Sequence, residues 1–148
     1  METYKCKYFK PYELVSPDFY EQFDNPDMIY SIFDENALRI LDMIRDWADV
    51  GLTVCNWYWG GVRTDSGFRT AKSKWGTKTS RHRKAMAFDV VSPKITTLRL
   101  WSLINANEDK LPCKIRIEKM NGGMPVNWLH FDTDASLSQK EKVYYFNA

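Results

Sequence analysis

Imidazole and thiol groups are scarce in this chain. His82 and His130 are the only histidines among 148 residues, and the cysteines are Cys6, Cys55 and Cys113. Because the cysteines are odd in number, lie far apart and form no CxxC, the pattern argues against a disulfide framework and against a thiolate metal site. We expect free thiols and synthesis in a reducing compartment.

Long apolar runs are also absent, as is a strong charge of either sign. No stretch approaches the ~18 apolar residues of a membrane-spanning helix, and the N-terminus lacks the apolar segment and cleavage site of a signal peptide. The net charge of +2 carries no overall nucleic-acid signature. We therefore expect synthesis in a cytoplasm, no membrane insertion and no nucleic-acid partner. If the protein acts outside the cytoplasm, another component must deliver it there.

Aromatic residues, by contrast, are abundant, with 6 Trp, 8 Tyr and 8 Phe. This is more than a core of this size usually needs, so some rings should line a groove, although each single ring fits the core equally well. The length suits one domain. We divide it into an N-terminal wrap (1–33), a core (34–133) and a C-terminal tail (134–148).

Hydrophobic periodicity predicts an α+β fold, with a small antiparallel sheet and flanking helices. Residues 34–50 carry apolar side chains at helical spacing, with Asp34 as the N-cap and Gly51 as the terminating glycine. Ser16 and Pro17 begin a short helix within the N-terminal wrap. The remaining predicted elements are a helix at 95–106 and strands at 52–56, 85–91, 113–119 and 128–132.

Strand alternation places chemically useful side chains on shared faces. Asp89 shares its face of the 85–91 strand with Ala85 and Ala87, and these small residues leave room for a ligand. The runs 113–119 and 128–132 are typical of a hairpin around a Gly-rich turn. By alternation, its polar face carries Arg116, Glu118, Trp128, His130 and Asp132.

These patterns suggest a metal site. Two imidazoles and one carboxylate are a protein ligand set of a catalytic zinc ion, whose fourth position is left for water. His82, Asp89 and His130 supply that set. Asp89 interrupts an apolar strand, where an unpaired buried charge would be unfavourable. The residues alone also permit a plainer interpretation, in which each histidine is a satisfied polar residue beside a strand.

A basic segment precedes the 85–91 strand. Residues 72–84 contain six Lys or Arg residues and no acidic residue. Such a run is usually a solvated loop, and it can also attract an anionic polymer. The six are Lys72, Lys74, Lys78, Arg81, Arg83 and Lys84.

Three motifs resemble those of one known family. Ser80-x-His82-x-x-Ala85-x-Ala87-x-Asp89 is similar to the SxHxxGxAxD motif of the zinc D-Ala-D-Ala carboxypeptidase family. That family includes bacteriophage L-alanyl-D-glutamate endopeptidases and shares its fold with the hedgehog signalling domain. Trp128-x-His130-x-Asp132 resembles the family's WxHxD motif, and Ser66-Gly67-Phe68-Arg69 resembles the preceding SGxR. The motifs occur in the family's order.

The resemblance implies a hedgehog/DD-peptidase fold with one zinc ion held by His82, Asp89 and His130. It also implies that Arg69 binds the substrate carboxylate or polarises the scissile carbonyl, a role for which a guanidinium fork is suited. A structural ion pair is the alternative role for Arg69. Ser80 is expected at the site as a substrate contact or as an outer hydrogen-bond partner of His82.

The same resemblance implies a substrate groove. Trp128 and Asp132 are expected to contact the substrate there, and Asp132 can instead orient a metal ligand from behind. The groove would be walled by the aromatic side chains of Trp57, Tyr58, Trp59, Trp75 and Trp128.

The sequence departs from the family pattern at two positions. The motif glycine is Ala85, a small change that a strand conformation would tolerate. Asn127 occupies the position, three residues before the second histidine, where many relatives carry the catalytic carboxylate, and an amide is no general base. Other relatives carry a glutamate on the preceding strand, and Glu118 fits that pattern. We therefore expect Glu118 to be the base, with Asp132 as the alternative.

The expected function is that of a zinc peptidase acting on peptidoglycan stem peptides, as an endopeptidase or a carboxypeptidase. A monomeric phage protein is expected, made in the host cytoplasm and acting at the cell wall as a lysin or as part of a virion. Two alternatives stay open. One is a catalytically inactive relative that binds metal and wall peptide as a structural module, which Asn127 favours. The other is nucleic-acid binding through the basic segment and the tryptophans.

Overall fold

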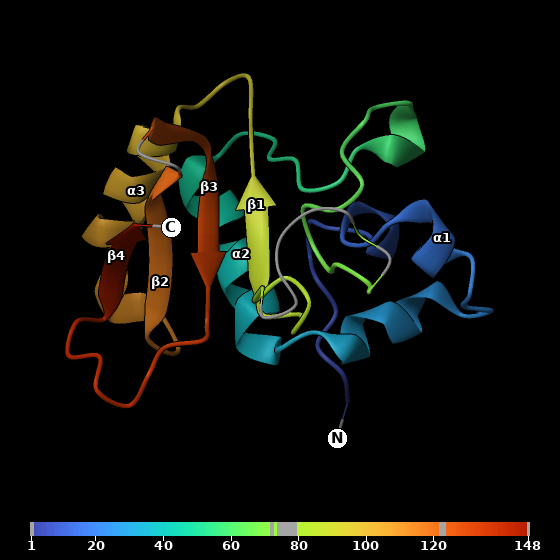
Figure 1. Cartoon of the computed structure of the whole chain (residues 1–148), viewed down its shortest axis with the longest axis horizontal. Coiled ribbons are helices and arrows are strands. Elements are labelled where there is room, and N and C mark those ends of the chain that lie inside the picture. The colour runs from blue at the N-terminus through green and yellow to red at the C-terminus, as the bar shows by residue number, and fades with distance from the viewer. Residues whose placement is uncertain (1, 72, 74–79, 122–123, 148) are drawn as a thin grey trace.

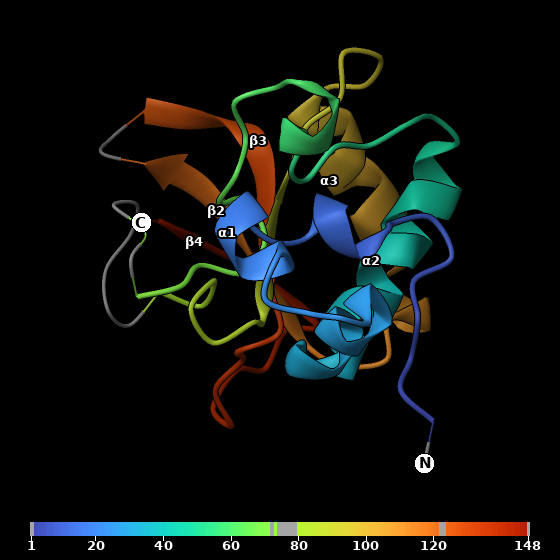
Figure 2. The same cartoon turned by 90° about the vertical axis from the view of Figure 1, so that its right-hand side faces the viewer.

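The computed structural model describes residues 2–71, 73, 80–121 and 124–147. One four-stranded sheet, in the order β1-β3-β2-β4, is covered on one face by two helices, which lie behind it in Figure 1 and beside it in Figure 2. The predicted α+β class is confirmed. The sheet and its helices comprise β1 (Ala87–Val90), β2 (Ile115–Asn121), β3 (Met124–Asp132), β4 (Val143–Asn147), α2 (Glu35–Ala48) and α3 (Thr97–Ala106).

The sheet is mixed, so the expectation of a wholly antiparallel sheet was wrong. The pairs β1–β3 and β2–β3 are antiparallel, as the hairpin prediction required, but β4 pairs with β2 in parallel. The chain after β3 returns to the end of the sheet where β2 begins, and the backbone N–H of Ile115 donates to the Lys142 carbonyl there at 2.9 Å. An apolar C-terminal run that starts at this end can only extend alongside β2 in the same direction.

Helix α2 buries one apolar stripe against the sheet, including Leu38, Leu41 and Ile44. Asp34 caps it as predicted, since its carboxylate accepts a hydrogen bond from the Ala37 N–H at 3.1 Å. The helix ends earlier than predicted, at Asp49 in the left-handed conformation (φ 53°), and not at Gly51. In the described part of the chain, no helix is long and apolar enough to span a membrane.

Residues 2–33 wrap the side of the sheet next to β1 in short turns (Figure 1). The predicted cap is confirmed, because the Ser16 hydroxyl accepts from the Phe19 N–H at 3.4 Å. The side chains of Leu14, Val15 and Ile29 from this region are fully buried in the single core cluster. The short helices of this segment are η1 (Pro11–Glu13), α1 (Pro17–Tyr20) and η2 (Pro26–Ile32). Two further short helices, η3 (Trp57–Trp59) and η4 (Glu108–Lys110), come later in the chain.

The strand predicted at 52–56 is absent. Only Thr53 makes a bridge, to Val91, and the following backbone groups bond to turns instead. The Cys55 N–H donates to the Glu13 carbonyl at 2.8 Å, so this apolar run is buried without a neighbouring strand. A short apolar run does not by itself distinguish a strand from a buried connection.

Strand β1 is shorter than predicted, and Ala85 lies outside it with φ at 56°. Its N–H donates to the His82 carbonyl at 3.2 Å and its own carbonyl accepts from the Asp34 N–H at 3.0 Å, which fixes a tight turn. The left-handed conformation costs a non-glycine residue ~1–2 kcal/mol. Glycine is the residue suited to this position, so the expectation that strand geometry tolerates Ala85 was wrong.

We predict that Ala85→Gly leaves the free energy of unfolding within ~1 kcal/mol of wild type. Relief of the left-handed strain offsets the lost methyl burial of ~0.8 kcal/mol and the extra chain entropy of ~0.4–1 kcal/mol. The control Ala87→Gly, in the extended strand and fully buried, has no such relief and should destabilise by ~1–2 kcal/mol. Urea unfolding of metal-free protein measures both. An equal loss of stability in the two variants would contradict the left-handed turn at Ala85.

Candidate metal centre

One row of side chains crosses three strands on the sheet face opposite the helices. Asp89 on β1 pairs in register with His130 on β3, which pairs on its other side with Glu118 on β2. All three side chains are buried. The alternation of the hairpin therefore brings a histidine and two carboxylates together, as the sequence predicted.

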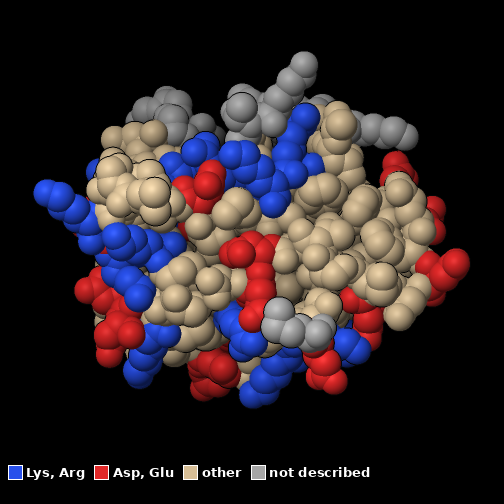
Figure 3. Space-filling model, turned by 90° about the horizontal axis from the view of Figure 1, so that it is seen from below, with Lys and Arg blue, Asp and Glu red and all other residues tan. Residues whose placement is uncertain are grey.

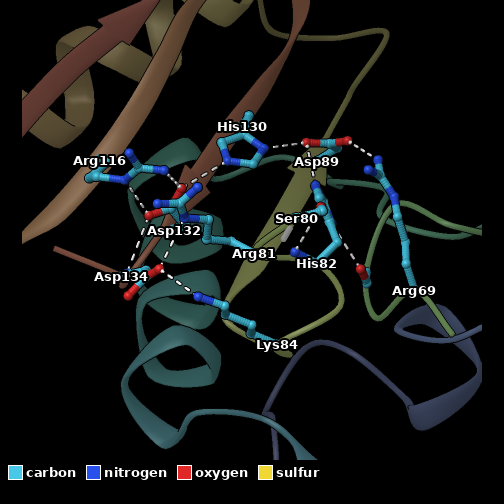
Figure 4. Close-up of polar contacts among 11 residues, drawn as sticks. Arg69, Ser80, Arg81, His82, Lys84, Asp89, Arg116, His130, Asp132 and Asp134 are labelled. Atoms are coloured by element: carbon cyan, nitrogen blue, oxygen red, sulfur yellow. Dashed lines mark hydrogen bonds and ion pairs between the residues drawn. The ribbon is translucent and has the colours of Figure 1, made fainter. Parts of the chain in front are cut away.

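His82 joins this row from the turn before β1 (Figure 4). Its Nε2 lies 3.2 Å from Asp89 Oδ1, and His130 Nδ1 lies 2.9 Å from the same oxygen. The potential ligand atoms of the three residues all lie within 4.8 Å of one another. The two shorter separations are close to the ~3.3 Å between ligands of a tetrahedral ion with bonds of ~2.0–2.1 Å. The group can therefore hold a metal ion.

The outer nitrogen of His82 is held by a backbone carbonyl. Its Nδ1 lies 2.8 Å from the Gly67 oxygen, and a carbonyl only accepts, so Nδ1 carries the proton and Nε2 is free for a metal. Gly67 has no room for a side chain, because a Cβ there would lie 2.0 Å from the Leu14 oxygen. Ser80 makes no hydrogen bond with the ring, and its hydroxyl accepts from the His82 backbone N–H at 3.3 Å. The role of Gly67 was missed, although the SGxR motif contains it.

His130 is held from behind by Asp132. The His130 Nε2–H donates to Asp132 Oδ2 at 3.0 Å, which leaves Nδ1 facing Asp89. Asp132 is fully buried and also binds the Arg116 guanidinium through both oxygens, at 2.8 and 2.9 Å. The Asp134 N–H adds a fourth hydrogen bond. Asp132 therefore lies behind a candidate ligand, and because it is fully buried it is not accessible for the direct substrate contact also expected from the sequence.

The charges of this cluster stabilise one another. Burial alone would raise the pKa of Asp89, but the adjoining His82 and His130 rings outweigh it and hold that pKa well below its usual range. Burial likewise opposes the charged form of His130, yet its bonds to Asp132 and Asp89 raise its pKa to about 9. Asp132, bonded to His130 and Arg116, has its pKa lowered to about 2 against the effect of burial. In the absence of metal, the proton on His130 is thus strongly held.

Arg69 forms an ion pair with the second oxygen of Asp89. Its Nη2 lies 3.2 Å from Asp89 Oδ2, and its Nε–H donates to the Asp65 carbonyl at 2.9 Å. The ion pair considered from the sequence is therefore present, and it orients the oxygen that faces both histidines. Nη1 of Arg69 makes no hydrogen bond with any residue the structure describes, so a substrate role for Arg69 stays a prediction.

Glu118 differs from the other carboxylates of the site. It is 8% exposed, and within the described part of the chain no group donates a hydrogen bond to it or pairs with it. Burial raises the pKa of Glu118, and the Asp89 and Asp132 carboxylates raise it further. The positive charges of His130 and Arg69 act in the opposite direction. Asp132 is saturated with donors, whereas Glu118 keeps its lone pairs. The geometry therefore favours Glu118 over Asp132 as a proton acceptor.

Asn127 lies on the other side of the hairpin. Alternation along β3 sets it opposite to His130 and Asp132, and it lines a groove of about 1300 Å³ beside α3 together with Trp101 and Val126. Its position gives it no access to the His-Asp-His group. An amide at this position therefore says little about whether the site is catalytic.

The aromatic side chains expected to wall a groove do not all lie together, and part of the basic segment is outside the described residues. Trp128 is half-buried on the same face of β3 as His130, but η3, which carries Trp57, Tyr58 and Trp59, lies apart from β1, the strand of Asp89 (Figure 1). Trp75, Lys72, Lys74 and Lys78 lie outside the described residues. Asp134 pairs with Arg81 and Lys84, and basic and acidic side chains are interspersed on the face seen from below (Figure 3).

Together these contacts define a buried His-Asp-His group with its outer hydrogen bonds in place, which is the class of site that a metal ion can occupy. Comparisons with protein-family models, with curated proteins and with solved structures found no match. The interpretation of this site thus depends on its geometry and on the motifs.

We predict that Asp132→Asn weakens Zn²⁺ binding ~10–100-fold, because the outer carboxylate fixes the His130 tautomer and ring orientation. Asp134→Asn is the matched control, since it contacts Arg81, Lys84 and Asp132 but neither histidine, and it should stay within about twofold of wild type. Competition with a chromophoric chelator measures both affinities. Equal affinities of Asp132→Asn and wild type would contradict the assigned tautomer.

The metal-free protein should lose stability between neutral and alkaline pH through His130. Its folded pKa of about 9 lies above the ordinary value of 6.5, so its stabilising effect is complete below pH 6.5 and is lost as pH rises through 9. We expect the melting temperature of wild type to exceed that of His130→Gln, and we expect this difference to be larger near pH 6 than near pH 10. Thermal unfolding in EDTA measures this difference. A constant difference would show that His130 is not charged in the folded metal-free protein.

Proposed function

We propose that this chain is a zinc-dependent peptidase of the hedgehog/DD-peptidase type that cleaves peptidoglycan stem peptides. Two independent lines support the proposal. The SGxR, SxHxxGxAxD and WxHxD-like motifs occur in family order, and the motif residues His82, Asp89 and His130 converge in one buried cluster. We place its action at the bacterial wall, as a phage lysin or a virion component.

Zinc fits the donor set better than a harder cation does. Two neutral imidazole nitrogens and one carboxylate suit zinc, whereas calcium and magnesium prefer oxygen ligands throughout. With three protein ligands, a bound zinc ion would supply an activated water at neutral pH and polarise a carbonyl. His82 and His130 would provide Nε2 and Nδ1, respectively, because their other nitrogens are engaged by Gly67 and Asp132.

Glu118 would take the proton of the attacking water and return it to the leaving amine nitrogen. The observation that carries this assignment is a buried carboxylate with no partner among the described residues, directly opposite His130 in the sheet. Its pKa is raised by burial, which brings it nearer to neutral pH and makes proton return easier. Among the described residues this carboxylate makes no side-chain hydrogen bond or ion pair that would give it a structural role.

Arg69 would serve two roles at once. Through Nη2 it holds Asp89, and through Nη1, which makes no hydrogen bond with a described residue, it can bind a carboxylate or carbonyl oxygen of the substrate. Stem peptides carry free carboxylates, for which a guanidinium group is the most suitable partner.

Hydrolysis of purified sacculi by the zinc-loaded protein tests the proposal. Wild type should release new amino groups, and Glu118→Gln should lower kcat ~10²–10⁴-fold while it still binds zinc, since only proton transfer is lost. Asn127→Asp is the control, because this side chain is exposed on the other side of the hairpin, and it should retain wild-type activity.

Each outcome separates a different part of the proposal. A zinc-bound wild type that releases no amino groups would show that the chain binds metal without cleaving wall peptides. Full activity of Glu118→Gln would exclude Glu118 as the base. A gain in activity with Asn127→Asp would show that position 127 reaches the substrate after all.

A further inference from the structure

Exposed apolar side chains gather at one turn that the metal centre does not use. Seven large apolar residues are exposed in the described part of the chain, and Tyr58, Trp59 and Val62 lie within five positions of one another. Their exposed fractions are 54%, 61% and 93%. The other four are scattered over separate elements. Clustering of this kind marks an interaction site more often than single exposed residues do.

The turn that carries these residues is closed and tightly built. The Asn56 N–H donates to the Arg63 carbonyl at 3.1 Å, and the Arg63 N–H donates back to the Asn56 side chain at 2.9 Å. Gly60 adopts φ of 89°, and a Cβ on Gly61 would lie 2.2 Å from the Asn56 side chain. The indole N–H of Trp57 donates to the Val15 carbonyl at 2.7 Å, which ties the turn to the body of the protein.

The exposed rings are also held by one another. Tyr12 from η1 stacks on Tyr58, with ring centroids 3.9 Å apart and planes 17° apart, and it meets Trp59 edge to face at 5.6 Å. Tyr12, Tyr58 and Trp59 together are called the aromatic platform below. Rings that are fixed before binding lose little conformational entropy when a partner stacks on them.

The chemistry around the aromatic platform restricts the partner. Residues 56–62, Asn-Trp-Tyr-Trp-Gly-Gly-Val, contain no charged side chain, although 27% of the chain is charged. Arg63, which closes the turn, donates from Nη1 to the Ser66 hydroxyl at 3.3 Å, so the residues that carry the exposed rings offer a polyanion no counter-charge. Three rings are also too few for a stable protein interface, which buries ~800 Å² on each partner. A small, uncharged unit with flat C–H faces and hydroxyl groups matches the rings and their phenol groups.

We propose that the aromatic platform binds the sugar rings of a neutral polysaccharide, namely the N-acetylhexosamine strand of the wall. The identity of this polymer rests on the proposed function. The axial C–H groups of a pyranose carry partial positive charge and pack on the negative face of an aromatic ring. The phenol hydroxyls of Tyr12 and Tyr58 supply hydrogen bonds to sugar hydroxyl groups.

The aromatic platform is connected to the metal centre by a short, ordered segment. Residues 60–67 run from the platform to Gly67, whose carbonyl holds His82, and the neighbouring Ser66 carbonyl accepts from the Asp89 N–H at 2.8 Å. Eight residues span at most ~28 Å. A glycan strand held on the platform would therefore keep its attached peptides near the metal centre, which raises their effective concentration.

Isothermal titration in EDTA with a tetramer of β-1,4-linked N-acetylglucosamine, and with glycan strands stripped of peptide, tests the proposal. Wild type should bind both saturably, and Trp59→Ala should bind at least about tenfold more weakly because a stacked ring is lost. Leu98→Ala, which removes an exposed apolar side chain from α3, should stay within about twofold of wild type.

The two proposals fail separately in this design. If neither sugar binds wild type, or if Trp59→Ala binds as wild type does, the platform proposal is overturned regardless of peptidase activity. A sugar-free stem peptide reports on the peptidase alone, and Trp59→Ala should cleave it at the wild-type rate. Sugar binding that depends on Trp59, without cleavage of that peptide, would support the platform and overturn the peptidase.

Discussion

The Asp89 carboxylate is the point on which the candidate site depends. One of its oxygens faces His82 and His130, and the other pairs with Arg69. These three partners come from the turn before β1, from β3 and from the loop at 64–70, so one buried anion connects three separate segments. A buried carboxylate is unfavourable unless it is paired, and these partners supply the compensation.

A second layer of contacts fixes how the partners of Asp89 are presented. Gly67 holds His82 through a carbonyl, and Asp132 holds His130 with the support of Arg116. The Arg116 guanidinium in turn lies 4.2 Å from the Phe146 ring centroid on β4. The C-terminal strand thereby contributes to the position of a candidate metal ligand, through a chain of contacts that begins at the parallel edge of the sheet.

Much of the site followed from local patterns, because strand alternation is a short-range property. Glu118, His130 and Asp89 were expected on one sheet face, and their register in the structure agrees. The candidate ligands were likewise found from spacing and motif. Local pattern failed at Ala85, whose neighbours suggested a strand. Its left-handed turn is set by hydrogen bonds to His82 and Asp34, and the latter lies far away in the sequence.

The sequence by itself determined the α+β class, the capped helix α2, the hairpin and the three residues that can hold a metal, since each depends on periodicity or on residue chemistry. Only the tertiary structure decided that β4 lies parallel to β2 and that Gly67 and Asp132 orient the histidines. It likewise separated the η3 rings from the metal centre and left Glu118 buried without a described partner. These features depend on contacts between distant segments, whose geometry no local pattern encodes.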